Sequence, residues 1–177
     1  YIVFVDSDDF IDSKMIESLF EAAVDSDADL VICDYSFVDE TGMIQKNYPS
    51  LKEEIIDSQT ASNYIYQSSG VRYIVAWNKL YKRYIFDDLR FDVGKIHEDE
   101  FIIHKVLLKS KRIKVLSGSY YYYLSRSDSI MGKGYSVKSL DYIEALFDRY
   151  LYFDEHKMDG LRNITKKRIL DEYALSK

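Results

Sequence analysis

The opening of the chain places three carboxylates within four residues. Tyr1 to Val5 is apolar and runs directly into Asp6, Ser7, Asp8 and Asp9. Crowded carboxylates raise one another's pKa and repel, and a bound divalent cation removes that repulsion. Hard carboxylate oxygens suit Mg²⁺ or Mn²⁺. The stretch therefore predicts a metal site, with an equally good interpretation in which the aspartates only decorate the start of a helix.

A second acidic group stands in the middle of the chain, at 97–100, with the sequence His-Glu-Asp-Glu. An apolar helical pattern follows it, so these residues open a helix. One interpretation is a general base presented at the helix N-terminus. The other is that the carboxylates stabilise the positive end of the helix by roughly 0.3–1 kcal/mol each, and taken alone this second interpretation is favoured.

Aromatic and basic side chains gather between these two acidic groups. Trp77 is either a stacking platform for a sugar ring or a core residue. Lys79, Lys82 and Arg83 predict either contacts to a phosphate or acceptor, or a solvated charged face, which is the default for such a group. The chain has 17 tyrosines, which suit surfaces that contact carbohydrate.

The elements that must position these residues follow from the hydrophobic pattern. The run at 1–5 is typical of a buried strand, and we expect it in a parallel sheet, where ligands bind beyond the carboxyl ends of the strands. Helical spacing predicts helices at about 13–26, 61–69, 98–108, 137–155 and 161–175. Strands are expected at 30–38, 43–48, 74–76, 113–116 and 119–124. Gly70 is expected to end the second helix.

Composition limits the class of protein. The 177 residues fit about one domain, and 47% hydrophobic residues are enough to build a core. A net charge of −6 argues against a nucleic-acid partner. The single cysteine, Cys33, lies in an apolar stretch and predicts a buried structural thiol in a reducing compartment. No apolar run is long enough to span a membrane.

Taken in order, the motifs resemble a known family. The order is an apolar strand with Asp-Ser-Asp-Asp, then Ala-Trp-Asn-Lys-Leu-Tyr at 76–81, then Glu-Asp-Glu at 98–100, then Tyr-Tyr-Tyr at 121–123 with Arg126. This is similar to the bacterial family 2 glycosyltransferases of the GT-A fold that build capsular and other surface polysaccharides. The resemblance covers Tyr1 to about Met131.

The resemblance implies roles for individual residues. Asp6 matches the aspartate at the nucleoside end of the donor, and Asp8 matches the main metal ligand of the aspartate-x-aspartate motif. Asp99 matches the catalytic base. Arg126 falls on a loop that would close over the diphosphate. On the acceptor side the resemblance places Trp77, Asn78, Lys79 and Glu98.

The same resemblance implies the architecture: an α/β protein with a partial, Rossmann-like GT-A mixed sheet flanked by helices, and a C-terminal helical pair. Residues 1–135 would be the C-terminal part of the catalytic domain and 136–177 a helical extension. The chain opens on a strand without a methionine, so we expect nucleotide-binding strands to precede it in the full protein, and the fragment alone to be inactive.

The expected partners follow from the family. They are a nucleotide-sugar donor, with a UDP-sugar favoured, and a saccharide or lipid-linked saccharide acceptor. We expect a cytoplasmic location, at most peripheral to the inner face of the membrane. An exposed sheet edge would allow two copies to pair. Two other functions stay open: a non-catalytic carbohydrate-binding module, and a phosphatase of the haloacid-dehalogenase type, whose nucleophilic aspartate also follows a strand.

Overall fold

The computed structural model describes residues 1–46, 50–125 and 140–175. Within them a seven-stranded mixed sheet has the order β1-β6-β3-β7-β2, with β4 beside β3 and β5 beside β7. The strands are β1 (Ile2–Val3), β2 (Phe10–Ile11), β3 (Leu30–Val38), β4 (Ile44–Lys46), β5 (Glu54–Ile56), β6 (Lys79–Tyr81) and β7 (Ile113–Leu124). The helices are α1 (Met15–Ser26), α2 (Ser58–Tyr64), α3 (Val71–Ile74), α4 (Glu98–Lys109), α5 (Leu140–Glu155) and α6 (Asp159–Leu175), with a 3-10 turn at Arg83–Phe86.

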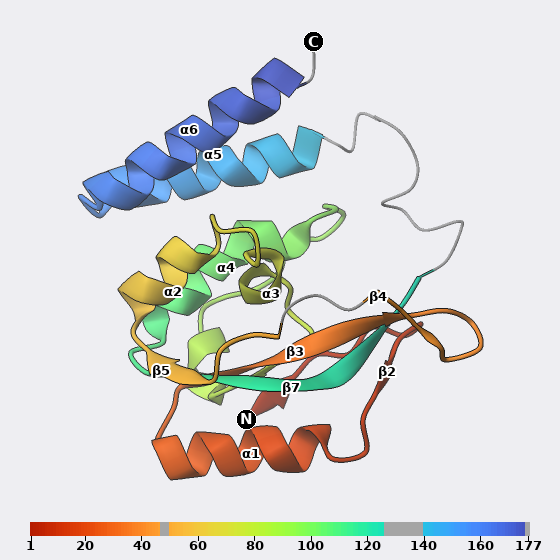
Figure 1. The fold of residues 1–177 in the computed structure, drawn as a ribbon. Helices are drawn as coiled ribbons and strands as arrows, with labels where there is room; N and C mark the ends of the chain where they lie inside the picture. Colours follow the sequence, from red (N-terminus) through yellow and green to blue (C-terminus); the bar gives the residue numbers. More distant parts are fainter. Residues whose placement is uncertain (47–49, 126–139, 176–177) are drawn as a thin grey trace.

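The elements form layers on the two faces of the sheet. Helix α1 covers one face, α2, α3 and α4 cover the other, and the α5–α6 pair lies outside α4 (Figure 1). Each face has its own apolar core. The core under α1 includes Met15, Leu19 and Tyr121, and the core under α4 includes Ile103 and Leu107.

The long strands β3 and β7 form the centre of the sheet. They run parallel from Leu30 opposite Ile113 to Val38 opposite Leu124, with a register shift around Asp34. Cys33 lies in β3 with no exposed surface, so the prediction of a buried thiol is confirmed. Burial raises its pKa to about 12. Beyond the register shift, the carboxyl end of β7 reaches the turn that contains Asp6, Asp8 and Asp9, here called the acidic turn.

The opening strand differs from the prediction. β1 is two residues long and half-buried, and it pairs antiparallel with β6. The prediction of a buried strand in a parallel sheet was therefore wrong. An apolar run indicates that a strand is covered but carries no information on the direction of its neighbour. Among the described residues, β6 is the strand that pairs with β1.

Other local predictions had mixed outcomes. The ranges for β3, α1, α4 and α6 are confirmed, and the range for α5 is confirmed from Leu140 onward, since 137–139 lie outside the described residues. The expected strand at 74–76 was wrong, because α3 extends to Ile74 and the strand lies at β6. Gly70 precedes α3 with a helical backbone and does not end α2. The two strands expected around Gly118 are one continuous strand, β7. A side chain at Gly118 would lie 2.4 Å from the Tyr120 ring, so this position has room only for glycine unless the ring moves.

The predicted boundary at 135/136 lies outside the described residues and stays a prediction. No helix among the described ranges is both long enough and apolar enough to cross a membrane.

Candidate functional site

The turn after β1 is built around a tyrosine from β7. The backbone N–H of Asp9 donates to the carbonyl of Asp6 at 3.2 Å. The Asp9 carboxylate accepts from the Tyr121 hydroxyl at 2.8 Å and from the Leu124 N–H at 2.9 Å. The same hydroxyl accepts from the Asp6 N–H at 3.1 Å. Asp9 and Tyr121 therefore fix the shape of the turn.

The other two aspartates of the turn, Asp6 and Asp8, are exposed. The pKa of Asp6 is raised, first by partial desolvation and then by the charges of Asp9, Asp8 and Glu98. Glu98 belongs to the first turn of α4, so its influence on Asp6 means that the two acidic segments lie near each other. The turn has an excess of negative charge that a cation would relieve.

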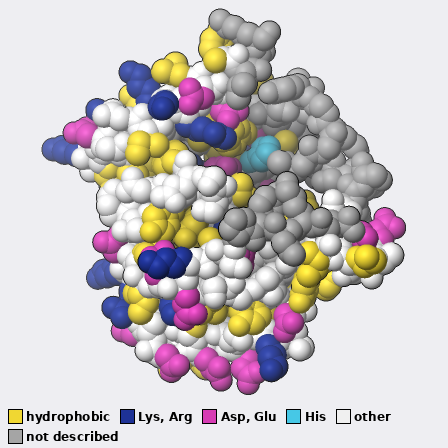
Figure 2. Space-filling model, in the orientation of Figure 1, with side chains coloured by type: hydrophobic (Ala, Val, Ile, Leu, Met, Phe, Trp, Pro, Cys, Tyr) yellow, Lys and Arg dark blue, Asp and Glu magenta, His cyan; other side chains and the backbone are white. Residues whose placement is uncertain are grey.

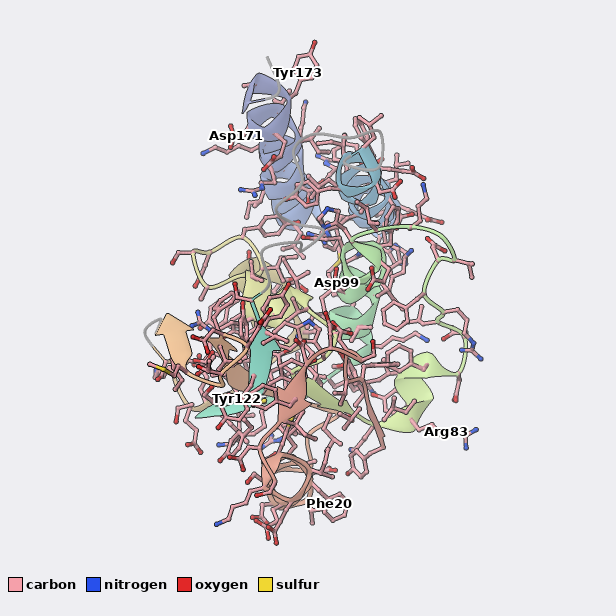
Figure 3. The ribbon with its side chains drawn as sticks, turned by 90° about the vertical axis from the view of Figure 1, so that its right-hand side faces the viewer. Phe20, Arg83, Asp99, Tyr122, Asp171 and Tyr173 are labelled. Atoms are coloured by element: carbon pink, nitrogen blue, oxygen red, sulfur yellow. The ribbon has the colours of Figure 1, made fainter. Side chains whose placement is uncertain are left out.

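The start of α4 presents the second acidic group. Asp99 is half-buried and Glu98 is exposed. Burial, and after it the charges of Glu100 and Glu98, raise the pKa of Asp99 to about 7, and the charge of Lys79 opposes them. Figure 3 places Asp99 between the sheet and the α5–α6 pair, whereas Phe20 and Arg83 point outward. A carboxyl group with a pKa near neutrality can exchange a proton at physiological pH.

The residue before α4 has an unusual backbone. Figure 2 shows a histidine and acidic side chains near one another on one face of the molecule. His97, which precedes α4, has a left-handed backbone with φ of +58°. The Asp99 carboxylate also accepts from the N–H of Glu100 at 2.9 Å. The left-handed turn at His97 therefore separates the preceding loop from α4, which begins at Glu98.

The residues expected on the acceptor side, other than Glu98, are buried. Trp77 stacks on Tyr121 with ring centroids 4.2 Å apart and is 7% exposed. Asn78 has no exposed surface and donates to the carbonyls of Cys33 at 2.7 Å and Arg72 at 3.0 Å. Their predicted role toward an acceptor stays a prediction. The observed contacts of Trp77 and Asn78 join β6 to the rest of the fold, and those of Asn78 connect it to β3 and α3.

Lys79 is a buried cation beneath Asp99. Its Nζ donates to the Arg72 carbonyl at 3.0 Å, to the Asn78 Oδ1 at 2.7 Å and to the Val75 carbonyl. Burial lowers its pKa to about 7, against the charge of Asp99. The interpretation of Lys79 as part of a solvated charged face is therefore wrong. The local pattern could not show this, because two of the three oxygen acceptors are carbonyls of α3 and its C-terminal end.

Several structural partners of the site have no motif in the sequence. Tyr121 is identifiable only as one member of an alternating tyrosine run. A second set is an ion pair between Arg72 and Asp34, at 2.5 Å and nearly fully buried. It holds α3 against β3, and Asp34 also accepts from the Leu51 N–H at 3.0 Å. Arg126, expected near the diphosphate, lies outside the described residues.

The ligands that a metal ion requires can be compared with the side chains of the site. Across the described ranges, no group of three or more His, Cys, Asp and Glu side chains is placed to hold one. Mg²⁺ is commonly bound by one or two carboxylates, completed by water and substrate phosphates. Exposed Asp8, with Asp6 nearby, fits an ion whose remaining ligands are water and substrate phosphates. It does not fit an ion whose ligands all come from the protein.

Comparison with known proteins gives the class. No family model matches the chain. Glycosyltransferase GlyA of Streptococcus pneumoniae is 35% identical over 136 residues, which is 73% of this chain and 20% of that protein. Glycosyltransferase GlyG of the same organism is 33% identical over 140 residues, 74% of this chain and 46% of that protein. The chain is homologous to bacterial glycosyltransferases.

Two further comparisons extend this result. The putative glycosyltransferase EpsH of Bacillus subtilis is 27% identical over 92% of this chain and 48% of its own length. The crystal structure of S. aureus TarS 1–349 in complex with UDP-GlcNAc matches with a TM-score of 0.68 at 21% identity, covering 90% of this chain and 46% of the chain in that structure. The fold, a mixed α/β sheet with a C-terminal helix pair, matches part of the GT-A fold of TarS. The chain spans a half or less of each of these proteins.

Proposed function

We propose that the chain is part of a metal-dependent, inverting family 2 glycosyltransferase. It would transfer a sugar from a nucleotide-diphosphate donor, with a UDP-sugar favoured, to a saccharide acceptor during surface polysaccharide synthesis. The homology to glycosyltransferases supports the class, and the TarS complex with UDP-GlcNAc supports the donor. The observation that carries the proposal is a pair of neighbouring acidic segments, one with an exposed carboxylate at Asp8 and one with a neutral-range carboxyl at Asp99.

The residues divide the chemistry between them. The acceptor hydroxyl gives its proton to the Asp99 carboxylate while its oxygen forms a bond to the anomeric carbon. The bond from that carbon to the leaving phosphate oxygen breaks, and the nucleoside diphosphate leaves with the electron pair. Attack opposite the leaving group, in one displacement, inverts the anomeric centre. A base whose pKa lies near the working pH combines a large deprotonated fraction with useful basicity.

Asp8 and Asp6 serve the donor in this proposal. Asp8 would hold Mg²⁺ or Mn²⁺ together with the donor phosphates, and the metal supplies neutralisation of the charge on the leaving diphosphate. Asp6 would contact the nucleoside end. The bridge from Tyr121 to Asp9 keeps both carboxylates on the exposed side of the turn, because Asp9 is bound to β7.

The test uses the full-length protein that carries this chain. Asp99→Asn should lower sugar transfer by about 10²–10⁴-fold, the usual contribution of a general base. Binding of UDP with Mn²⁺, measured by calorimetry, should stay within about twofold of the original because Asp99 is not a donor contact. Glu17→Gln, an exposed carboxylate in the first turn of α1, is the control, because α1 lies on the opposite face of the sheet from α4. Near-normal turnover of Asp99→Asn would remove the base assignment.

A further inference from the structure

The C-terminal helix α5 contacts the chain on both sides of Asp99. On the N-terminal side, the Asp141 carboxylate accepts from the Ile96 N–H at 3.0 Å and from the Lys95 Nζ at 3.2 Å. Glu144, one turn further along α5, accepts from the same Lys95 Nζ at 2.6 Å. The segment that leads into α4 is therefore held by two carboxylates of α5.

On the C-terminal side of Asp99, the contact is a buried ion pair. The Arg149 side chain donates from Nη2 to the Glu100 carboxylate at 2.5 Å and to the Glu100 carbonyl at 3.0 Å. Arg149 is 1% exposed. A guanidinium that binds both the side chain and the backbone of one residue fixes its position more firmly than a surface ion pair does. Glu100 directly follows Asp99, so this contact fixes the residue beside the proposed base.

Between these two contacts the backbone is strained. His97 adopts φ of +58° and ψ of +37°, a left-handed conformation that costs a residue with a side chain about 1–3 kcal/mol. Such a conformation persists only where the surroundings determine it. Here Ile96 on one side and Glu100 on the other are both bound to α5. The left-handed turn at the start of α4, two residues before Asp99, thus depends on contacts from a separate element.

We propose that α5 is the positioning element for Asp99, with Asp141 and Arg149 as positioning residues. This inference rests on the proposed function, since it assigns α5 a part in the same site. Neither side chain touches the acidic turn that would hold the donor. Their loss should therefore act on the catalytic step and not on donor binding. The C-terminal helical pair would then be a working part of the catalytic unit.

The alternative is that α5 only covers the outer face of α4, and the chain offers a matched control for it. Lys105, further along α4, donates to Asp148 of α5 at 2.8 Å. This pair also joins the two helices, but it lies well over one turn from Asp99. Lys105→Gln should lower the melting temperature without changing kcat, as any loss of a contact between these helices would.

The experiment compares Arg149→Met, Arg149→Lys and Asp141→Asn with Lys105→Gln in the full-length protein. With a UDP-sugar as the donor, Arg149→Met and Asp141→Asn should each lower kcat about tenfold or more while the KM for the donor stays within about twofold. Arg149→Lys should recover part of kcat, because it restores the charge without the two-point contact.

Arg149→Met leaves the Glu100 carboxylate buried without its partner, and that variant can fail to fold. Asp141→Asn removes a contact closer to the surface and keeps the test decisive. The proposal is overturned if Asp141→Asn and the folded Arg149 variants lose melting temperature as Lys105→Gln does but keep kcat. Failure of the proposed function gives a different result, in which Asp99→Asn itself keeps normal turnover.

Discussion

The acidic turn and the start of α4 have similar compositions and opposite surroundings. In both segments, the last carboxylate is bound to a neighbouring element of the fold. Asp9 is bound to Tyr121 and Leu124 of β7, and Glu100 is bound to Arg149 of α5. The carboxylate before it is the one to which we assign a chemical role in the proposed function. There the two segments differ: Asp8 is exposed, whereas burial raises the pKa of Asp99 to about 7. In the proposed function, one residue type would thus provide a cation ligand in one place and a proton acceptor in the other.

The pH dependence of transfer tests the second half of this contrast. If Asp99 is the base, only its deprotonated form is active, and its pKa is raised above the ordinary 3.8 to about 7. In the full-length protein, kcat should therefore fall about 50-fold between pH 7 and pH 5, with a slope that approaches about tenfold per pH unit at the acid end. Steady-state rates across pH 5–9 measure this. A profile that is flat down to pH 5 contradicts a neutral-range base.

Substitution of Asp9 tests whether the last carboxylate of the acidic turn stabilises the fold. Asp9→Ala deprives the Leu124 N–H and the Tyr121 hydroxyl of their acceptor. We expect a loss of about 1–3 kcal/mol in the free energy of unfolding, the usual cost of leaving such groups unpaired. Urea unfolding followed by circular dichroism measures it. Asp8→Ala is the control and should leave stability nearly unchanged because Asp8 is exposed.

The metal role of Asp8 is tested by donor binding. Asp8→Asn should weaken binding of UDP in the presence of Mn²⁺ about tenfold, which corresponds to about 1.4 kcal/mol. Without the metal, the variant and the original protein should bind UDP almost equally. Calorimetry in Mn²⁺ and in a chelator compares the two conditions. An unchanged response to Mn²⁺ would remove Asp8 from the metal site.

The smallest expected effect concerns the hydroxyl that joins the turn to β7. Tyr121→Phe keeps the ring that stacks on Trp77 but loses the bridge between the Asp6 N–H and Asp9. We expect a loss of about 0.5–1.5 kcal/mol in stability. The affinity for UDP with Mn²⁺ should fall less than in Asp8→Asn. A loss of affinity equal to that of Asp8→Asn would mean that the bridge, and not the Asp8 carboxylate, controls donor binding.

The sequence predicted what is encoded locally. The range of β3 and the helices α1, α4, α5 and α6 follow from hydrophobic spacing, which reports how each segment meets a core. The acidic segments were found for the same reason, since clustered carboxylates are visible in the chain itself. Homology confirmed the glycosyltransferase class, and the match to TarS confirmed the fold.

What the sequence did not predict depends on distant partners. Nothing near Asp9 distinguishes it from Asp8, because the difference comes from Tyr121, which is 112 residues away. Lys79 has the sequence pattern of a surface charge, but the fold surrounds its Nζ with two carbonyls from α3 and its end and with the Asn78 side chain. The direction of β1 is set by β6, which the hydrophobic pattern placed a few residues too early. Arg149 had no recognisable motif, since its meaning comes from packing against Glu100.

The buried thiol described above has a practical consequence. Cys33 is the single cysteine of the chain, and it sits in the strand between β6 and β7 with no exposed surface. With a pKa raised to about 12, it has almost no thiolate at neutral pH and no path to a reagent while the sheet is closed. Alkylation of the native protein would therefore proceed only through openings of the central strands. Its rate would report how often these strands open.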